Sequence, residues 1–160
     1  AALTTAQVNN LATASLAALS TAGIAALTTN QVVALTSAQL SSLASAQIAA
    51  LSSNAIGAIE TADLSGLTTA NVAVLRSAQL AGLATAQVAA LSTNQIAALS
   101  TAAVSGLSTN QIVALTTAQA SSLSTAQVAG LSTAAIAALE TADFAALKSD
   151  AIAALSANQV

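Results

Sequence analysis

The octapeptide LSTNQIAA at residues 91–98 is followed directly by LSTAAVSG at 99–106 and LSTNQIVA at 107–114. The same phrase, close to Leu-[Ser/Thr]-[Thr/Ser]-Ala-Gln-[Ile/Val]-Ala-Ala, continues in both directions. All 160 residues therefore read as twenty octads without an insertion or deletion. Octad positions are numbered here from 1, the leucine, to 8. Self-similarity at a fixed period indicates a repeat architecture, in which each unit buries its apolar residues against its neighbours.

The composition excludes several classes of function. Charged residues make up 4% of the chain and aromatic residues 1%, whereas average domains carry about 25% charged residues. With a net charge of −3 and two basic residues, we expect no nucleic-acid partner. Histidine and cysteine are absent, which removes thiolate metal sites and the usual nucleophile–base pairs. We therefore expect no enzymatic activity, no metal and no cofactor.

The mean hydropathy of +0.80 is high for a water-soluble chain. A membrane-spanning helix needs about 18 or more consecutive apolar residues. Ser, Thr, Gln or Asn interrupts every octad, so no run of that length exists. The hydropathy comes from alanine and two large apolar residues per octad, and we expect no membrane insertion.

Two regular conformations fit the octad poorly. In a continuous α-helix, eight residues leave an offset of about 80° per repeat, so the leucines would wind around the helix without forming a seam. In a straight β-strand, positions 1 and 6 would face opposite sides of the sheet. A parallel β-solenoid with a corner in each octad would solve this problem, and it remains the alternative fold, although alanine is depleted in strands.

The favoured fold is an all-α solenoid with one very short, capped helix in each octad. Position 3 is Ser or Thr in all octads but one, and such hydroxyls are common N-caps. Position 2 is a rival cap, because it forms an S-x-x-Q capping box with position 5. Position 2 is more variable, however, so we expect position 3 to cap. The expected helix caps are Thr5, Thr21, Thr29, Thr61, Thr93, Thr109 and Thr141.

Stacked coils would bury the apolar columns at positions 1 and 6, while small residues at positions 7 and 8 would let the coils approach closely. Small residues replace the position-5 glutamine at Gly23 and Ala55, and again at Ala103 and Ala135, each pair four octads apart. This spacing suggests four octads per coil, with three octads as the alternative. The expected core includes Leu3, Leu11, Leu19, Ile24, Leu27, Val32, Leu35, Ile48, Leu67, Leu91, Ile96, Leu107, Ile112, Leu139 and Phe144.

A longer repeat of ten octads lies above the single octad. The segment TTNQVVALTSAQLSSL at 28–43 recurs as STNQIVALTTAQASSL at 108–123. Residues 1–80 and 81–160 are therefore diverged copies of one block within a single array. Neither end carries the polar capping repeat that solenoids normally need. We expect the array to continue in a longer protein, or copies to stack end to end, so that its partner is another part or another copy of itself.

The polar residues suggest structural roles. Glu60 and Asp63 recur as Glu140 and Asp143, and an acidic residue in the first turn of a helix favours its dipole. Arg76 and Lys148 share position 2 with Glu60 and Glu140, which indicates an exposed site. The position-5 glutamines are expected to close bends through hydrogen bonds to neighbouring backbone. A regular threonine array could bind ice or a polymer only if its hydroxyls are not used as caps.

Stretches such as LSTNQIAALSTAAVSGLSTNQIVALTTAQ at residues 91–119 resemble octapeptide arrays of very large bacterial exported or surface proteins, often labelled adhesin-like. The resemblance covers the entire chain. It implies an extracellular or cell-surface location and a role as a stalk, spacer or filament-forming segment. The alternative function is a binding module that presents regular Thr and Gln faces to a polymer or protein.

Overall fold

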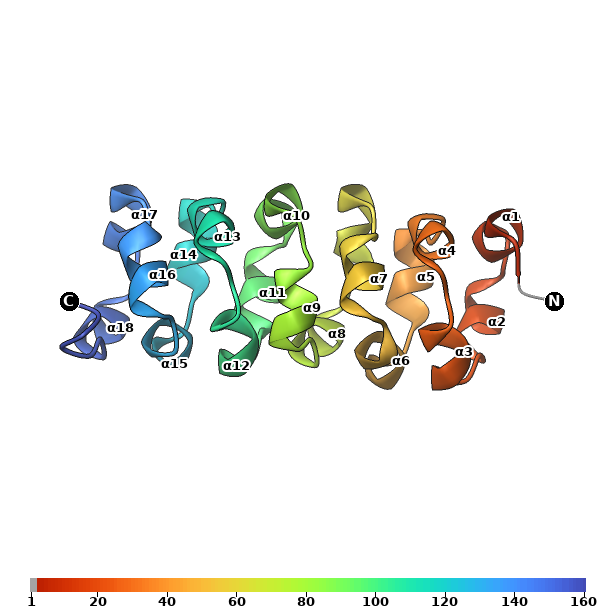
Figure 1. Ribbon diagram of the computed structural model, residues 1–160, viewed down its shortest axis with the longest axis horizontal. Coiled ribbons are helices and arrows are strands. Elements are labelled where there is room, and N and C mark those ends of the chain that lie inside the picture. Colours follow the sequence, from red (N-terminus) through yellow and green to blue (C-terminus); the bar gives the residue numbers. More distant parts are fainter. Residues whose placement is uncertain (1–2) are drawn as a thin grey trace.

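The computed structural model describes residues 3–160 as an elongated rod (Figure 1). Within these residues, nineteen helices of four to six residues follow one another, one in each of the first nineteen octads, and no strand is present. Ala1 and Ala2, which fill positions 7 and 8 of the repeat, lie outside the described residues. The prediction of an all-α solenoid with one short helix per octad is confirmed, and the β-solenoid alternative is wrong.

Each coil of the solenoid contains three octads. Helix α1 (Thr5–Asn9) packs against α4 (Thr29–Val33), which begins three octads later, and the same step joins every other well-packed pair of helices. The expected coil of four octads is therefore wrong. That prediction took the four-octad spacing of the small position-5 residues as the length of a coil. In the structure Gly23, Ala55 and Ala135 lie on three different sides of the coil, so their spacing does not follow the coil.

The helices form three rows along the rod, named side A, side B and side C. Side A contains α1, α4, α7 (Ser53–Gly57), α9 (Ser77–Ala81), α12 (Thr101–Val104), α15 (Thr125–Ala129) and α18 (Ser149–Ala153). Side B contains α2 (Thr13–Ala17), α5 (Ser37–Ser42), the 3-10 helix η1 (Thr61–Gly66), α10 (Thr85–Ala90), α13 (Thr109–Val113) and α16 (Thr133–Ala138). Side C contains α3 (Thr21–Ala25), α6 (Ser45–Ala50), α8 (Thr69–Ala73), α11 (Thr93–Ala98), α14 (Thr117–Ser122) and α17 (Thr141–Ala145).

The three sides wind around the long axis. In Figure 1, side A starts at the upper edge with α1 and reaches the lower edge at α15 and α18, whereas side C runs from α3 below to α17 above. A row of equivalent side chains on one side therefore follows a curved path along the rod. This curvature limits how flat a surface any single row can present.

The helix caps are at position 2, one residue before the expected position. Ser92 has an extended backbone, with φ −69° and ψ 158°, and its Oγ accepts a hydrogen bond from the amide of Gln95 at 3.2 Å. The expected caps are instead the first helical residues, namely Thr5, Thr21, Thr29, Thr61, Thr93, Thr109 and Thr141. The caps that precede them are Thr4, Ser20, Thr28, Glu60, Ser92, Ser108 and Glu140.

The cap prediction was wrong because the position-5 glutamine can fix the turn between two successive helices, called a corner here, without a capping hydroxyl at position 2. Position 2 is Ala44 at the start of α6, and no side chain caps the first amides there. Gln47 still accepts a hydrogen bond from the Ala44 backbone N–H, at 2.8 Å, because it sits at the third helical position. The hydroxyl at position 2 can therefore vary.

Positions 1 and 6 form one continuous apolar core, as the sequence predicts. Burying each Leu or Ile side chain contributes about 1.5–3 kcal/mol. Of the expected core, the buried members are Ile24, Val32, Leu35, Ile48, Leu67, Leu91, Ile96, Leu107, Ile112 and Leu139. Leu11, Leu19, Leu27 and Phe144 are only partly buried against it, and Leu3 is 38% exposed. Leu3, Leu11, Leu19 and Phe144 lie in the first and last coils, where the described chain offers a neighbouring coil on one side only, and Leu27 begins the second coil directly after the first.

Small residues at positions 7 and 8 let the coils approach closely, which confirms that expectation. A Cβ atom added to Gly66 of η1 would lie 2.1 Å from the Ser37 carbonyl oxygen of α5. One added to Gly57 of α7 would lie 2.3 Å from the Gly82 carbonyl oxygen at the end of α9. No described glycine has a positive φ, so these residues provide space and not an unusual backbone conformation.

Candidate functional site

The most specific chemistry of the described chain lies between coils, at the side chain of position 5. Gln95 of α11 accepts a hydrogen bond from the Ser92 backbone N–H through Oε1, at 2.8 Å. Its Nε2 donates to the carbonyl oxygens of Leu64 and Leu67, at 2.8 Å and 2.7 Å. Both carbonyls belong to the preceding coil, where η1 ends and the chain turns towards α8. Gln95 is 5% exposed, so this amide joins two corners from inside the rod.

The same bridge recurs along the rod. In residues 3–160, ten position-5 glutamines and Asn71 each donate to the carbonyl oxygen of one position-1 residue in the preceding coil. The two residues of every pair are separated in sequence by the same distance, one coil plus half an octad. The pairs are Gln31–Leu3, Gln39–Leu11, Gln47–Leu19, Asn71–Leu43, Gln79–Leu51, Gln87–Ile59, Gln95–Leu67, Gln111–Leu83, Gln119–Leu91, Gln127–Leu99 and Gln159–Leu131. The prediction that these glutamines hydrogen-bond neighbouring backbone is confirmed, and the partner is the coil beneath.

Four corners use alanine in place of glutamine. Ala55, Ala103, Ala135 and Ala151 are at most 2% exposed, so each fills part of the space between coils without making a bridge. No buried side-chain nitrogen or oxygen of the described residues lacks a hydrogen-bond partner. The bridge can therefore be omitted at single corners when the replacement is small and apolar, because no polar side-chain atom is then left unpaired.

The two aspartates at position 5 bind the helix of the preceding coil. Asp63 accepts a hydrogen bond from the backbone N–H of Ser37, the first residue of α5, at 2.7 Å. Asp143 accepts one from the Thr117 hydroxyl, at the start of α14, also at 2.7 Å. A carboxylate is favourable beside the free N–H groups of a helix N-terminus. Asp63 and Asp143 therefore have the structural role expected of them, but the helix N-terminus that each one contacts belongs to the preceding coil and not to its own helix.

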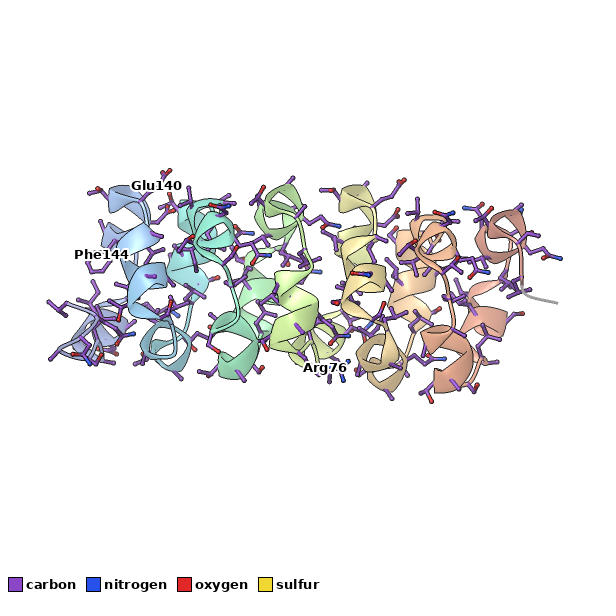
Figure 2. All side chains as sticks on the ribbon, in the orientation of Figure 1. Arg76, Glu140 and Phe144 are labelled. Atoms are coloured by element: carbon purple, nitrogen blue, oxygen red, sulfur yellow. The ribbon has the colours of Figure 1, made fainter. Side chains whose placement is uncertain are left out.

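The other charged side chains lie on the outer surface, including Asp150 in the first turn of α18. Glu60, Arg76, Glu140 and Lys148 all occupy the exposed N-cap position, and none of them caps its helix through its side chain. Figure 2 shows Arg76 and Glu140 on opposite edges of the rod and on coils far apart. No group of three or more His, Cys, Asp or Glu side chains in residues 3–160 is placed to hold a metal ion.

The position-3 residues are mostly exposed and do not cap, because the caps are at position 2. Two rows of exposed threonines cross four consecutive coils each. They are Thr61, Thr85, Thr109 and Thr133 on side B, and Thr69, Thr93, Thr117 and Thr141 on side C. Among these threonines, Thr117 donates to Asp143 and Thr133 to the Asn158 carbonyl oxygen. The sequence allowed a threonine array to bind ice or a polymer only if its hydroxyls are not caps, and the position-3 hydroxyls are not caps. The rows are not straight, however, because they follow the winding of the sides (Figure 1).

The depressions on the surface of the described residues are small and open to solvent. One of about 260 Å³ is lined by Ser65, Leu67, Thr69, Ala90, Ser92, Asn94 and Gln95. A second of about 290 Å³ is lined by Ser37, Ala38, Ser41, Ser65 and Gly66. A third of about 220 Å³ opens at the N-terminal end beside Leu3, Leu19, Gly23, Ala26, Leu27, Thr28 and Gln31. Their linings are hydroxyl, amide and aliphatic groups, without a titratable side chain.

Across residues 3–160, the helices are all too short to span a bilayer.

Comparison with known proteins gives a family and no individual relative. Neither the search of curated proteins nor the search of solved structures finds a match. The model of the ALTTAQ repeat matches residues 1–37, 56–93, 90–125 and 136–160, which together form most of the chain. The hexapeptide ALTTAQ itself stands at residues 114–119, where it contains a core leucine, the cap Thr116 and the bridging Gln119. The chain therefore belongs to the ALTTAQ repeat family.

Proposed function

We propose that this solenoid is a structural scaffold, which acts as a stalk, spacer or filament-forming segment of a bacterial extracellular or cell-surface protein. The family match makes the chain a repeat array. The location and the mechanical role rest on the resemblance of its octads to arrays of exported bacterial proteins and on the arguments below.

The observation that carries the proposal is the burial of the bridging glutamines. The glutamine is the longest polar side chain of the octad and would be the natural group to read a ligand. Gln79, Gln95 and Gln119 are 1–5% exposed, and their amides bind the preceding coil. The specific hydrogen bonds of the octad thus hold coil to coil, as the role of a scaffold requires.

The ten-octad repeat also supports a scaffold. Ten octads do not form a whole number of three-octad coils, so the second copy of the block is shifted by one side. Asp63 lies on side B and its counterpart Asp143 on side C, while α4 of side A is repeated as α13 of side B. Selection for one binding face would favour a block that returns its side chains to the same side.

A second candidate function is supported by the exposed threonine rows. Thr61, Thr85, Thr109 and Thr133 are exposed on consecutive coils of side B, and of these four hydroxyls that of Thr133 donates to the Asn158 carbonyl oxygen at 3.2 Å. A polymer with hydroxyl or amide groups could follow such a row, whereas the winding of the side opposes a flat surface such as ice (Figure 1). Replacing the four threonines by valine would remove the hydroxyls at similar size. The scaffold proposal expects no change in retention on immobilised polysaccharide.

Changing the number of octads tests the scaffold. Removing residues 75–98, which form three octads, joins Val74 to Leu99 in the same octad frame. We expect small-angle scattering to show a rod shortened in proportion to the residues removed, with the same cross-section and the same helical circular dichroism per residue. Removing residues 75–78 alone is the control, because half an octad breaks the frame and should disrupt packing beyond that point. A compact shape after the three-octad deletion would contradict the scaffold.

The proposed location has a separate test. Antibodies against the rod should label intact, unpermeabilised cells of the bacterium that makes the protein. Labelling only after permeabilisation would contradict a surface location and would leave the scaffold role standing.

A further inference from the structure

The amide bridges are distributed unevenly along the rod. Because a coil contains three octads, three consecutive position-5 residues contact the coil before it, one on each side. Gln79, Gln87 and Gln95 belong to the coil formed by α9, α10 and α11, and each donates to a position-1 carbonyl of the preceding coil, at 2.6–2.8 Å. This contact between coils therefore has a short amide bridge on all three sides.

The contact one coil earlier has few of these bonds. Its position-5 residues are Ala55 of α7, Asp63 of η1 and Asn71 of α8. Ala55 has no polar side-chain atom, and the Asp63 carboxylate accepts from the Ser37 backbone N–H, so neither donates to a carbonyl. Asn71 is one methylene shorter than glutamine, and its Nδ2 donates to the Leu43 carbonyl at 3.3 Å. One long bridge is thus present where the next contact has three short ones.

The other interactions of this contact do not replace the missing bridges. The Ser45 hydroxyl donates to the Ala70 carbonyl at 3.1 Å, but at an exposed position where water competes for the same groups. The apolar core is equally closed in both coils, since Val72 and Val88 are both fully buried. In addition, η1 is a 3-10 helix, whose hydrogen bonds have poorer geometry than those of the α-helix α10 that follows it on side B.

The same shortage of bridges recurs ten octads later. Ala135, Asp143 and Ala151 stand at position 5 of three consecutive octads, each 80 residues after its counterpart. The two alanines are buried and make no bridge, and Asp143 accepts from the Thr117 hydroxyl. Within residues 75–130, which lie between, six glutamines bridge and Ala103 is the exception. The ten-octad repeat thus contains one bridge-poor segment per copy, at residues 51–74 and 131–154.

The charged residues of the chain gather at the bridge-poor segments. They lie within the two segments or two residues after the first, and they are Glu60, Asp63, Arg76, Glu140, Asp143, Lys148 and Asp150. Charged residues beside an apolar segment that becomes transiently exposed oppose its aggregation. Their placement therefore fits segments that open.

We propose that the bridge-poor segments are the places where the rod opens first, so that bending or tension separates coils at points ten octads apart while the block between them stays folded. The proposal rests on the scaffold function proposed above and adds where the scaffold yields. Each coil of a solenoid contacts only its neighbours, so a contact with fewer bonds is not reinforced by more distant coils. Local opening of a folded protein begins where such contacts are fewest.

Proteolysis of the folded chain tests the proposal, because cleavage reports how often the segment around the cleaved bond is open. A glutamate-specific endopeptidase has a site after Glu60, in the first bridge-poor segment. Ala84→Glu places a second site at the same octad position of the next coil on side B. Both sites precede Thr-Ala, and in neither helix does the residue at that position cap through its side chain.

Cleavage of the Ala84→Glu chain is followed by mass spectrometry, and each rate is divided by the rate at the same bond in urea. We expect cleavage after Glu60 to be at least tenfold faster than cleavage after residue 84. The reason is that η1 lies at a contact with one long bridge, whereas α10 lies at a contact with three short ones.

Exchanging the bridges between the two contacts should reverse this order. The triple variant Ala55→Gln, Asp63→Gln and Asn71→Gln supplies the missing amides and should slow cleavage after Glu60 at least tenfold. In the Ala84→Glu chain, the converse set should accelerate cleavage after residue 84 by a similar factor. This set is Gln79→Ala, Gln87→Asp and Gln95→Asn, and because it only shortens side chains it provides the test if the first triple variant loses its helical circular dichroism.

Equal normalised rates after residues 60 and 84, or rates that respond to neither exchange of bridges, would overturn the proposal. Such a result leaves the scaffold standing if small-angle scattering still shows a rod. A chain without rod dimensions would instead contradict the scaffold itself, so the two failures are distinguishable.

Discussion

The first coil and the interior coils are built from the same octads, but their equivalent residues have different surroundings. Leu51 of an interior coil is fully buried, whereas Leu3 is 38% exposed. Gln95 bridges two coils, whereas Gln7 holds only its own corner. The difference shows that an octad gains much of its stability from the coil that precedes it. A helix of so few residues has little stability alone, and in a solenoid the nearest-neighbour contact supplies it.

The largest difference between the two regions is expected at the position-1 leucines. Leu51→Ala should lower the free energy of unfolding by about 2–5 kcal/mol, because it leaves a cavity in a closed core. Leu3→Ala should cost about 1 kcal/mol or less, since this side chain already contacts solvent. Urea denaturation followed by circular dichroism measures both. Equal losses at the two positions would mean that the first coil is packed as fully as the interior.

Glycine gives the next largest contrast. Gly66→Ala would force a Cβ to 2.1 Å from the Ser37 carbonyl oxygen, so α5 and η1 must separate at a cost of about 1–3 kcal/mol. Gly23→Ala meets only the Ser20 Oγ at 3.4 Å and the Leu19 Cβ at 3.8 Å. It should stabilise the chain by up to about 1 kcal/mol, because alanine favours the helix. Thermal unfolding of the two variants should move in opposite directions.

The bridging glutamine should give a smaller but more specific difference. Gln95→Ala leaves the carbonyls of Leu64 and Leu67 without this donor and should cost about 1–3 kcal/mol. Gln7→Ala loses only the bond to the Thr4 N–H and should cost about 0.5 kcal/mol. Amide hydrogen exchange near Ser92 offers a local readout, because its N–H loses the Gln95 acceptor and should exchange faster. Unchanged exchange there would argue against the bridge.

The smallest effect is expected at the caps. Ser92→Ala removes one half of a capping box and leaves Gln95 to hold the corner, so a loss of about 0.5 kcal/mol is expected. Ser100→Ala should cost about 1 kcal/mol, because Ala103 at position 5 provides no second half. Denaturant titrations of the two variants rank the corners. The reverse order would mean that the serine hydroxyl matters more when a glutamine is present.

The octad frame made the local structure predictable. The spacing of two large apolar residues per octad excluded a long helix and a straight strand, and the short-helix solenoid that remained is the observed fold. The buried column at position 6, including Ile24, Ile48 and Ile96, also followed from the frame. These features depend on residues that are neighbours in sequence, so a single octad already contains the information.

The predictions of the coil size and of the cap position were both wrong, and only the coil size depends on contacts between distant residues. Gln95 of one coil contacts Leu67 of the coil before it, and no pattern within one octad reveals that step. The cap was visible in principle, because the S-x-x-Q box places Ser92 at the start of the motif that Gln95 completes. The variation at Ala44 and Ala84 hid it, since the glutamine holds those corners alone.

The octad, which forms only one third of a coil, has a genetic consequence as the unit of repetition. Because each octad forms the same contact with the octad three places earlier, unequal recombination at any octad boundary would yield another folded rod. The protein can therefore lengthen or shorten in steps of a third of a turn, and each step rotates all downstream surface residues to the next side. Length can evolve freely in such a gene, whereas a ligand site spread over several coils would be broken by most length changes.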